Sequence, residues 1–302
     1  MLFAVVFFLK DFTHAIFCVI IHKRGNTMKY TVQSSKYVFK NFIYLFPFAI
    51  LPALFLAIST DEKLITSVIM NFVGGSIGEW TFIELFRAIS VISFGSTLSI
   101  VFGFIGIVSL VPCVALLMAL LEKHMRIGKQ TFNGLWGKLN DNFISTAGVV
   151  LLVIGIYELW ALLLSAFLFF LSRITIAVVA YTFVVLVFIA FHVLLMLMIG
   201  AIYLWLPCMQ ITGFRAVEAL TYSYQLMSPI KAKIVMMQLA ILTFTEALIC
   251  VCAVFLPMAI VFKSIATILY ASILMIFCVR MQIAYFDRDQ IERADLAKYY
   301  QR

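Results

Sequence analysis

The chain has 302 residues, of which 65% are hydrophobic and only 12% carry a charge, and its mean hydropathy is +1.11. This composition excludes an ordinary soluble domain, because about half of the residues in such a domain are apolar. The net charge of +8 does not indicate a nucleic-acid partner, because the basic residues are spread thinly along the flanks of the apolar segments.

The N-terminal segment, residues 1–27, admits two interpretations. Residues 2–21 are apolar and about as long as one membrane span. Three polar side chains interrupt this stretch, and it has neither a basic leader nor a small-residue cleavage site. It is therefore either an additional, poorly inserted helix, which would make seven spans, or the result of a start codon assigned too early. In the second case Met28 is the working start.

Six later apolar runs are long enough to cross a hydrocarbon core of roughly 30 Å, which takes about 20 helical residues. They lie at residues 41–58, 96–121, 144–171, 174–206, 233–262 and 264–285. The sequence therefore predicts an all-α, polytopic transmembrane helix bundle over residues 28–285. A polar tail over residues 286–302 follows it.

Lys and Arg are distributed unequally between the two sides that these spans define. The sparse side has only Lys63, Arg87, Arg173 and Lys263. Because short loops rich in Lys and Arg resist translocation, the basic side is predicted to be cytoplasmic, including the basic region at 23–40 and the C-terminus. Seventeen of the 22 basic residues fall on this side: Lys23, Arg24, Lys29, Lys36, Lys40, Lys123, Arg126, Lys129, Lys138, Arg215, Lys231, Lys233, Arg280, Arg288, Arg293, Lys298 and Arg302.

Two connectors on the basic side are predicted to be amphipathic helices that lie in the headgroup plane, where anionic lipid headgroups are partners. We interpret them as surface helices that close the cytoplasmic face of the bundle. Docking of another membrane subunit is the alternative. The first connector has an apolar stripe at helical spacing: Phe132, Leu135, Trp136, Leu139 and Phe143. The second has a similar set: Phe214, Val217, Leu220, Tyr224 and Met227.

The chain also contains a candidate internal repeat, with copies at residues 82–171 and 174–262. In each copy a Pro-Cys pair ends an inward-running span, and a single glutamate lies inside the outward-running span that follows. Because both copies run in the same direction, this would be a parallel repeat about an axis along the membrane normal. The alternative is a chance resemblance between hydrophobic hairpins.

The prolines of these pairs, Pro112 and Pro207, each remove a backbone donor within a predicted span. We expect each of them to kink or end its helix. A gating hinge is the alternative role for these positions.

Three side chains are the candidates for an intramembrane polar site: Glu158, Glu246 and His192. The two glutamates are predicted at similar depths, roughly 20 Å from the cytoplasmic ends of their spans. A charge at that depth costs on the order of 2.5 to 3.5 kcal/mol, so each carboxyl group must be neutral, paired or in contact with water. The site is either structural, with hydrogen-bonded neutral carboxyl groups, or it handles protons or cations.

The six cysteines all lie in apolar segments and lack the paired spacing of a disulfide framework or a zinc site. No metal site and no cofactor is predicted. The chain also lacks the His-Glu-x-x-His and Gly-x-Ser-x-Gly motifs of metalloproteases and serine hydrolases. We therefore expect a protein that is not an enzyme.

The basic lead into the first span, the spans that end in proline and the stretch at residues 213–227 resemble a family of poorly characterised six-helix bacterial membrane proteins. The family includes the membrane domain attached to some glycerophosphodiester phosphodiesterases. The resemblance implies a location in the bacterial cytoplasmic membrane. It does not imply phosphodiesterase activity, because no soluble catalytic domain accompanies these spans. The residues that match the family pattern are Gly213, Ala219, Leu220, Ser223 and Tyr224.

The sequence thus predicts a non-catalytic, multi-pass membrane protein that serves as an envelope scaffold or accessory subunit. The alternative is a small-solute or ion-coupled transporter that uses Glu158 and Glu246. A water-filled cavity that reaches both glutamates would favour the transporter, and a dry, fully packed bundle would count against it.

Overall fold

The computed structural model of the chain describes residues 29–128, 131–256 and 258–300, the side chains of residues 292–300 excepted. Within these ranges the regular elements are all helices, which confirms the predicted all-α class. The N-terminal segment 1–27 lies outside the described residues, so the choice between an extra helix and a late start stays a prediction.

The helices follow one another along the chain with short connections. Their bounds are α2 (Lys29–Lys40), α3 (Phe42–Ser59), α4 (Glu62–Gly74), the 3₁₀ helix η1 (Ile77–Glu79), α5 (Phe82–Ile89), α6 (Thr97–Ile127), α7 (Leu135–Ser172), α8 (Ala177–Ala201), α9 (Trp205–Thr212), α10 (Ala216–Met227), α11 (Lys231–Phe255) and α12 (Ala259–Tyr300).

Among the described residues, six helical stretches are long and apolar enough to cross a membrane, and each overlaps one predicted span in chain order. They are Phe42–Ser59, Thr97–Ile127, Leu135–Ser172, Ala177–Thr212, Lys231–Phe255 and Ala259–Ile291. The fourth combines α8 with the short helix α9. The predicted transmembrane helix bundle with six spans is therefore confirmed.

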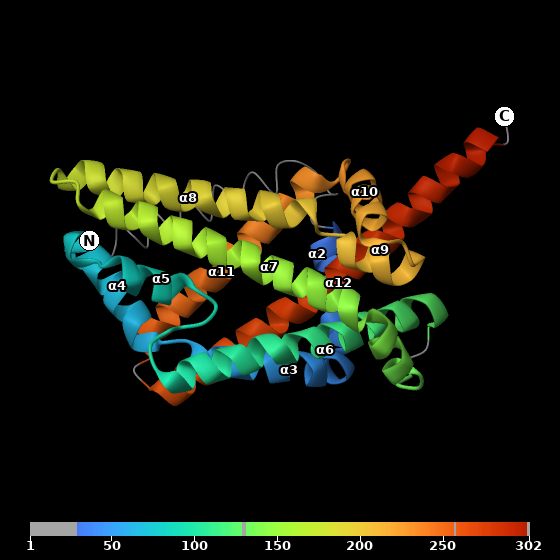
Figure 1. Cartoon of the computed structure of the whole chain (residues 1–302), viewed down its shortest axis with the longest axis horizontal. Coiled ribbons are helices and arrows are strands. Elements are labelled where there is room, and N and C mark those ends of the chain that lie inside the picture. Colours follow the sequence, from blue (N-terminus) through green and yellow to red (C-terminus); the bar gives the residue numbers. More distant parts are fainter. Residues whose placement is uncertain (1–28, 129–130, 257, 301–302) are drawn as a thin grey trace.

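The long helices run lengthwise through the molecule, and their connections gather at its two ends (Figure 1). One end contains α9, α10, the connection between α6 and α7, and the C-terminal part of α12, and we call it the basic end. The opposite end contains α4, α5 and the turns that join α7 to α8 and α11 to α12. This grouping is the one that the distribution of Lys and Arg predicts, while the orientation toward the cytoplasm stays a prediction.

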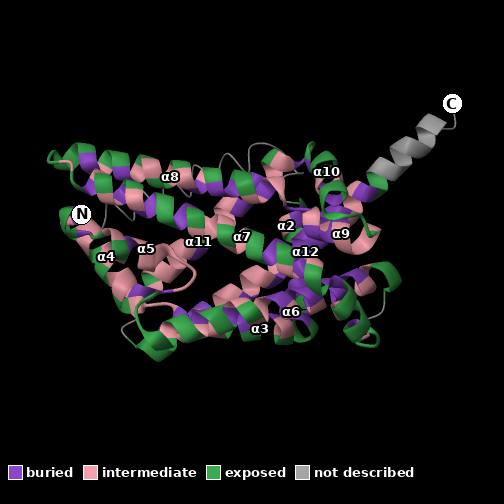
Figure 2. Ribbon diagram, in the orientation of Figure 1, coloured by how far each residue is buried: buried purple, intermediate pink, exposed green. Residues whose placement is uncertain are grey.

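Many large apolar side chains are exposed along the long helices. Figure 2 marks the exposed positions on the ribbon. Ile144 of α7 and Val178 of α8 are examples. In water such a surface would be unstable, but a lipid bilayer solvates it. The inward surfaces pack tightly, and a methyl group on Gly106 of α6 would lie 2.9 Å from the Leu56 side chain of α3. Small residues at such a contact let two membrane helices approach closely.

The structure joins the first predicted connector helix to the span that follows it. Helix α7 begins at Leu135 and continues without a break for 38 residues. Leu139 and Phe143 therefore belong to its first turns, and Phe132 precedes it. No proline interrupts the sequence between the apolar stripe and the span, so one helix continues through both. The second connector is a separate helix, α10.

The two prolines have different positions in their helices. Pro112 lies inside α6, which continues past it to Ile127 and so does not end there. Pro207 is the third residue of α9, after the chain leaves α8 at Ala201. In the first turn of a helix a missing N–H group leaves no hydrogen bond unmade, so Pro207 fits this place without distortion. Gly213 then ends α9 with a φ of 73°, a conformation that favours glycine.

Helix α2 is anchored to the basic end of α12 and to α6. The Lys29 ammonium forms an ion pair with Asp287 at 2.8 Å, and the Tyr30 hydroxyl donates to the same carboxylate at 2.5 Å. Tyr37 is hydrogen-bonded to Nδ1 of His124 near the end of α6. The first described helix is thus part of the bundle, although it is too polar to be a span.

Candidate functional site

Two helices bring Glu246 and His192 together. Oε2 of Glu246 in α11 lies 2.8 Å from Nε2 of His192 in α8, and Nδ1 of the same ring lies 2.8 Å from the carbonyl oxygen of Phe188. His192 is buried, and the ring of Trp160 packs edge-on against it. The histidine that sequence analysis offered as a partner therefore contacts one of the two glutamates.

The geometry around His192 determines where protons lie. A backbone carbonyl only accepts hydrogen bonds, so Nδ1 carries a proton and donates it to Phe188. The contact between Nε2 and Glu246 then contains one further proton, either on the imidazole, as an ion pair, or on the carboxyl group, as a neutral pair. In both states the pair has no net charge, which makes its position inside the bundle tolerable.

Glu158 has a different set of partners. One of its carboxyl oxygens accepts a hydrogen bond from the backbone N–H of Val91 at 2.9 Å, and the other lies 2.8 Å from the hydroxyl of Ser90. The preceding residue in α7, Tyr157, donates to the carbonyl oxygen of Ile89 at 2.9 Å. The Tyr157 contact satisfies one of the last carbonyl groups of α5, which have no partner inside the helix, and the Glu158 contacts hold the two residues that follow α5. Glu158 therefore fastens the connection between α5 and α6 to α7.

The two glutamates have no common hydrogen-bond partner among the described residues. The hydrogen bonds of Glu158 go to a connecting segment, and the hydrogen bond of Glu246 goes to a neighbouring helix. The internal repeat, and the pseudo-symmetric use of the two residues that it implies, stay predictions.

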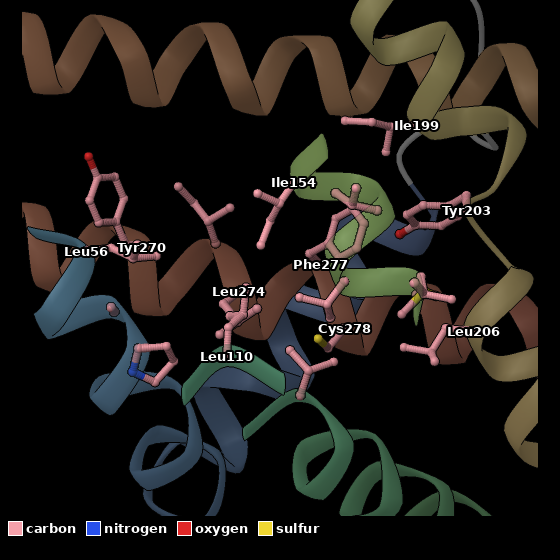
Figure 3. Close-up of a pocket in the computed structure, with 18 of the residues that line it drawn as sticks. Leu56, Leu110, Ile154, Ile199, Tyr203, Leu206, Tyr270, Leu274, Phe277 and Cys278 are labelled. Atoms are coloured by element: carbon pink, nitrogen blue, oxygen red, sulfur yellow. The ribbon is translucent and has the colours of Figure 1, made fainter. Parts of the chain in front are cut away.

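A cavity of about 340 Å³ lies among α3, α6, α7, α8, α9 and α12 (Figure 3). Aliphatic and aromatic side chains line nearly all of it. Figure 3 shows Tyr270 and Tyr203 at opposite ends of the group of lining residues. None of the three predicted site residues, Glu158, Glu246 and His192, belongs to the lining.

Sequence analysis missed a buried cation beside this cavity. Arg280 of α12 is only 2% exposed, and its Nε donates to the Tyr203 hydroxyl at 2.9 Å. Its Nη1 is buried without a hydrogen-bond partner among the described residues. In the count of basic residues on the flanks of spans, Arg280 served only to indicate the orientation of the chain. The helical spacing was the signal that could have found it, because Arg280 continues the stripe of cavity-lining residues along α12.

The described part of the chain has no group of three or more His, Cys, Asp or Glu side chains that could hold a metal ion. The described cysteines are all free thiols: Cys113, Cys208, Cys250, Cys252 and Cys278. The arrangement therefore offers hydrogen bonding, one titratable pair and an apolar cavity.

Six apolar helices with internally paired polar groups have the architecture of a multi-pass helical membrane protein. Comparisons with protein-family models, with curated proteins and with solved structures find no match to this chain. The resemblance to six-helix bacterial membrane proteins accordingly stays a prediction.

Proposed function

We propose that this protein is a non-catalytic component of the bacterial cytoplasmic membrane, an envelope scaffold or accessory subunit with its basic end in the cytoplasm. The observation that carries the proposal is that the intramembrane carboxyl groups are engaged with the protein itself. Glu158 accepts from Ser90 and Val91, and Glu246 pairs with His192. Groups used in this way stabilise helix positions.

The properties of the cavity support the same conclusion. A carrier of a small polar solute or an ion needs polar groups along its path, and in known transporter folds the site lies near the bilayer midplane between helices. Here the cavity is apolar, and the glutamates are not part of its lining. Its walls supply almost no ligands for a hydrated solute.

An ion-coupled transporter is the second candidate, favoured by the Glu246–His192 pair. The pair contains a proton that either partner can hold, and the Glu246 side chain is 29% exposed in the bundle. A group of this kind inside a span is a reasonable element of a proton path. If the protein is a transporter, this pair is its coupling site.

Complementation and proton flux measured on the same variants test the two candidates. A strain that lacks the protein is supplied with the wild-type chain, Glu246→Gln or Glu158→Gln, and the purified proteins are reconstituted into vesicles that contain a pH-sensitive dye. We expect both variants to restore the phenotype. We also expect the proton flux into vesicles that contain the wild-type protein or either variant to be no faster than the flux into empty vesicles. Two results together would contradict the scaffold proposal. Glu246→Gln would fail to complement although its abundance is normal, and the wild-type protein would carry a proton flux that Glu246→Gln abolishes.

A further inference from the structure

We propose that a cleft at the basic end binds the headgroup of an anionic phospholipid, with the phosphate on Arg126. The cleft has a volume of about 500 Å³ and lies between α6 and α12, apart from the two connectors for which the sequence predicts lipid contacts. The residues that line it are Met125 and Arg126 of α6 and Ile283, Phe286, Asp287 and Gln290 of α12.

The first support is the position of the cleft along the two helices. The second and sixth predicted spans end at residues 121 and 285. Arg126 and Gln290 each follow such an end by five residues, which is about 7 Å of helix. The headgroup region of a bilayer is roughly 5 to 7 Å thick on each side, so the sequence places the cleft at the level of the headgroups.

The second support is the charge balance around the cleft. The buried Glu122 carboxylate lies 2.7 Å from Nη1 of Arg126 and 3.6 Å from Nζ of Lys138, and it balances only one of these two cations. Asp287, the acidic residue of the lining, is already paired with Lys29 at 2.8 Å. The three cations and two carboxylates of this group therefore leave a surplus of one positive charge, which attracts an anion.

The Arg126 side chain can bind a phosphate while it keeps its contact with Glu122. That contact uses Nη1, and a guanidinium group has five N–H donors in a planar fork. The Arg126 side chain is 55% exposed and lines the cleft, whereas the Glu122 side chain is only 7% exposed. A ligand in the cleft therefore reaches the remaining donors of Arg126, and their geometry suits the oxygens of a phosphate.

The apolar part of the cleft favours a lipid over a free phosphate. The α12 residues of the lining recur at intervals of three and four, so they lie on one face of that helix. Ile283, Phe286 and Met125 are half-buried and pack against the main hydrophobic core. Their exposed parts offer contact to the glycerol and the first methylene groups of a lipid. A small hydrophilic phosphate gains nothing from such contact.

The experiment compares probes that share either their tails or their phosphate. The full chain, purified in detergent, is incubated with dioleoylphosphatidylglycerol, with dioleoylglycerol or with glycerol 3-phosphate at equal concentrations, and bound molecules are counted by native mass spectrometry. We expect retention of dioleoylphosphatidylglycerol alone. Equal retention of dioleoylglycerol would show that the phosphate is not recognised, and equal retention of glycerol 3-phosphate would show that the ligand is not a lipid. Either result, or retention of no probe, overturns the proposal.

Variants assign the binding to the cleft. Arg126→Gln should weaken binding of dioleoylphosphatidylglycerol by about tenfold, because it removes a charge-assisted contact. Arg215→Gln is the matched control, because it removes an exposed guanidinium group at the same end of the bundle, at the start of α10 and outside the lining. This control should leave binding unchanged. Equal effects of the two substitutions overturn the proposal.

Two further variants keep the test decisive if Arg126→Gln does not fold. Gln290 is exposed and lines the cleft, so its replacement leaves the pair of Arg126 and Glu122 intact. Gln290→Glu adds a negative charge and should weaken binding of dioleoylphosphatidylglycerol by about fivefold. Gln290→Lys adds a positive charge and should strengthen it by about the same factor. Equal binding by these two variants overturns the proposal.

Discussion

Glu246 and His192 form a hydrogen-bonded pair that links α8 to α11, with 2.8 Å between Oε2 and Nε2. The pair contains one proton between its two members, so an amide in place of the carboxyl group reproduces the neutral state by donating to Nε2.

We therefore expect Glu246→Gln to melt close to the wild-type temperature. Glu246→Leu leaves His192 without this partner and should lower the free energy of unfolding by about 1 to 3 kcal/mol. Thermal melting in detergent at constant lipid content checks the difference. A large loss of stability in the glutamine variant would mean that the ion-paired form is required.

Glu158 should matter locally because it holds the end of α5. Replacing it with Leu removes the acceptor for the Val91 N–H and the Ser90 hydroxyl, and we expect amide hydrogen exchange to accelerate around residues 89–92. Glu158→Gln keeps one carbonyl acceptor and should protect most of this segment. Exchange that rises evenly over all six spans would show instead that Glu158 supports the whole bundle.

The start of α7 provides a matched pair of surface changes. Trp136 is 78% exposed in the bundle, and we predict that it lies at the membrane interface, so Trp136→Asp should reduce the amount of protein in the membrane. Lys138→Gln removes one of two cations near the buried Glu122, while Arg126 remains paired with it at 2.7 Å. Lys138→Gln should therefore change the stability of the protein by about 1 kcal/mol at most. Equal tolerance of both changes would argue against an interfacial position.

Docking of α2 should weaken in alkali. Burial raises the pKa of Tyr37 to about 12, and burial with the hydrogen bond to Asp287 raises the pKa of Tyr30. A raised pKa means that the protonated phenol favours the folded state, so this stability is fully present below about pH 10 and is lost as the pH rises toward about 12. The melting temperature of Tyr37→Phe should fall less steeply over this range than that of the wild type. If the melting temperatures of the two proteins fall in parallel as the pH rises, Tyr37 does not contribute to this loss of stability.

The two ends of the bundle should face opposite sides of the membrane. Ser76 lies in the connection between α4 and η1, and Asn140 lies in the first turns of α7 at the basic end. In a background without other cysteines, Ser76→Cys should react with a membrane-impermeant thiol reagent in intact cells. Asn140→Cys should react only after the membrane is opened. Labelling of both in intact cells would be incompatible with the proposed orientation.

The six spans could be predicted because each is a continuous apolar run longer than the hydrocarbon core is thick. The start of α7 at Leu135 could not be predicted in this way, because hydropathy shows where a span is apolar and not where its helix begins. The partner of Glu158 is 68 residues away in sequence, beyond the reach of any helical periodicity. Arg280 was recognised only as one of the basic residues on a flank, because its burial depends on how α8, α9 and α12 pack together.

Helix α12 has 42 residues without interruption, a length of about 63 Å, which is about twice the thickness of the hydrocarbon core. Its C-terminal end projects past the other helices (Figure 1), while its middle turns form one wall of the cavity. One continuous helix therefore supplies the wall around Phe277 and Met281 and also extends well beyond the length that a hydrocarbon core can hold.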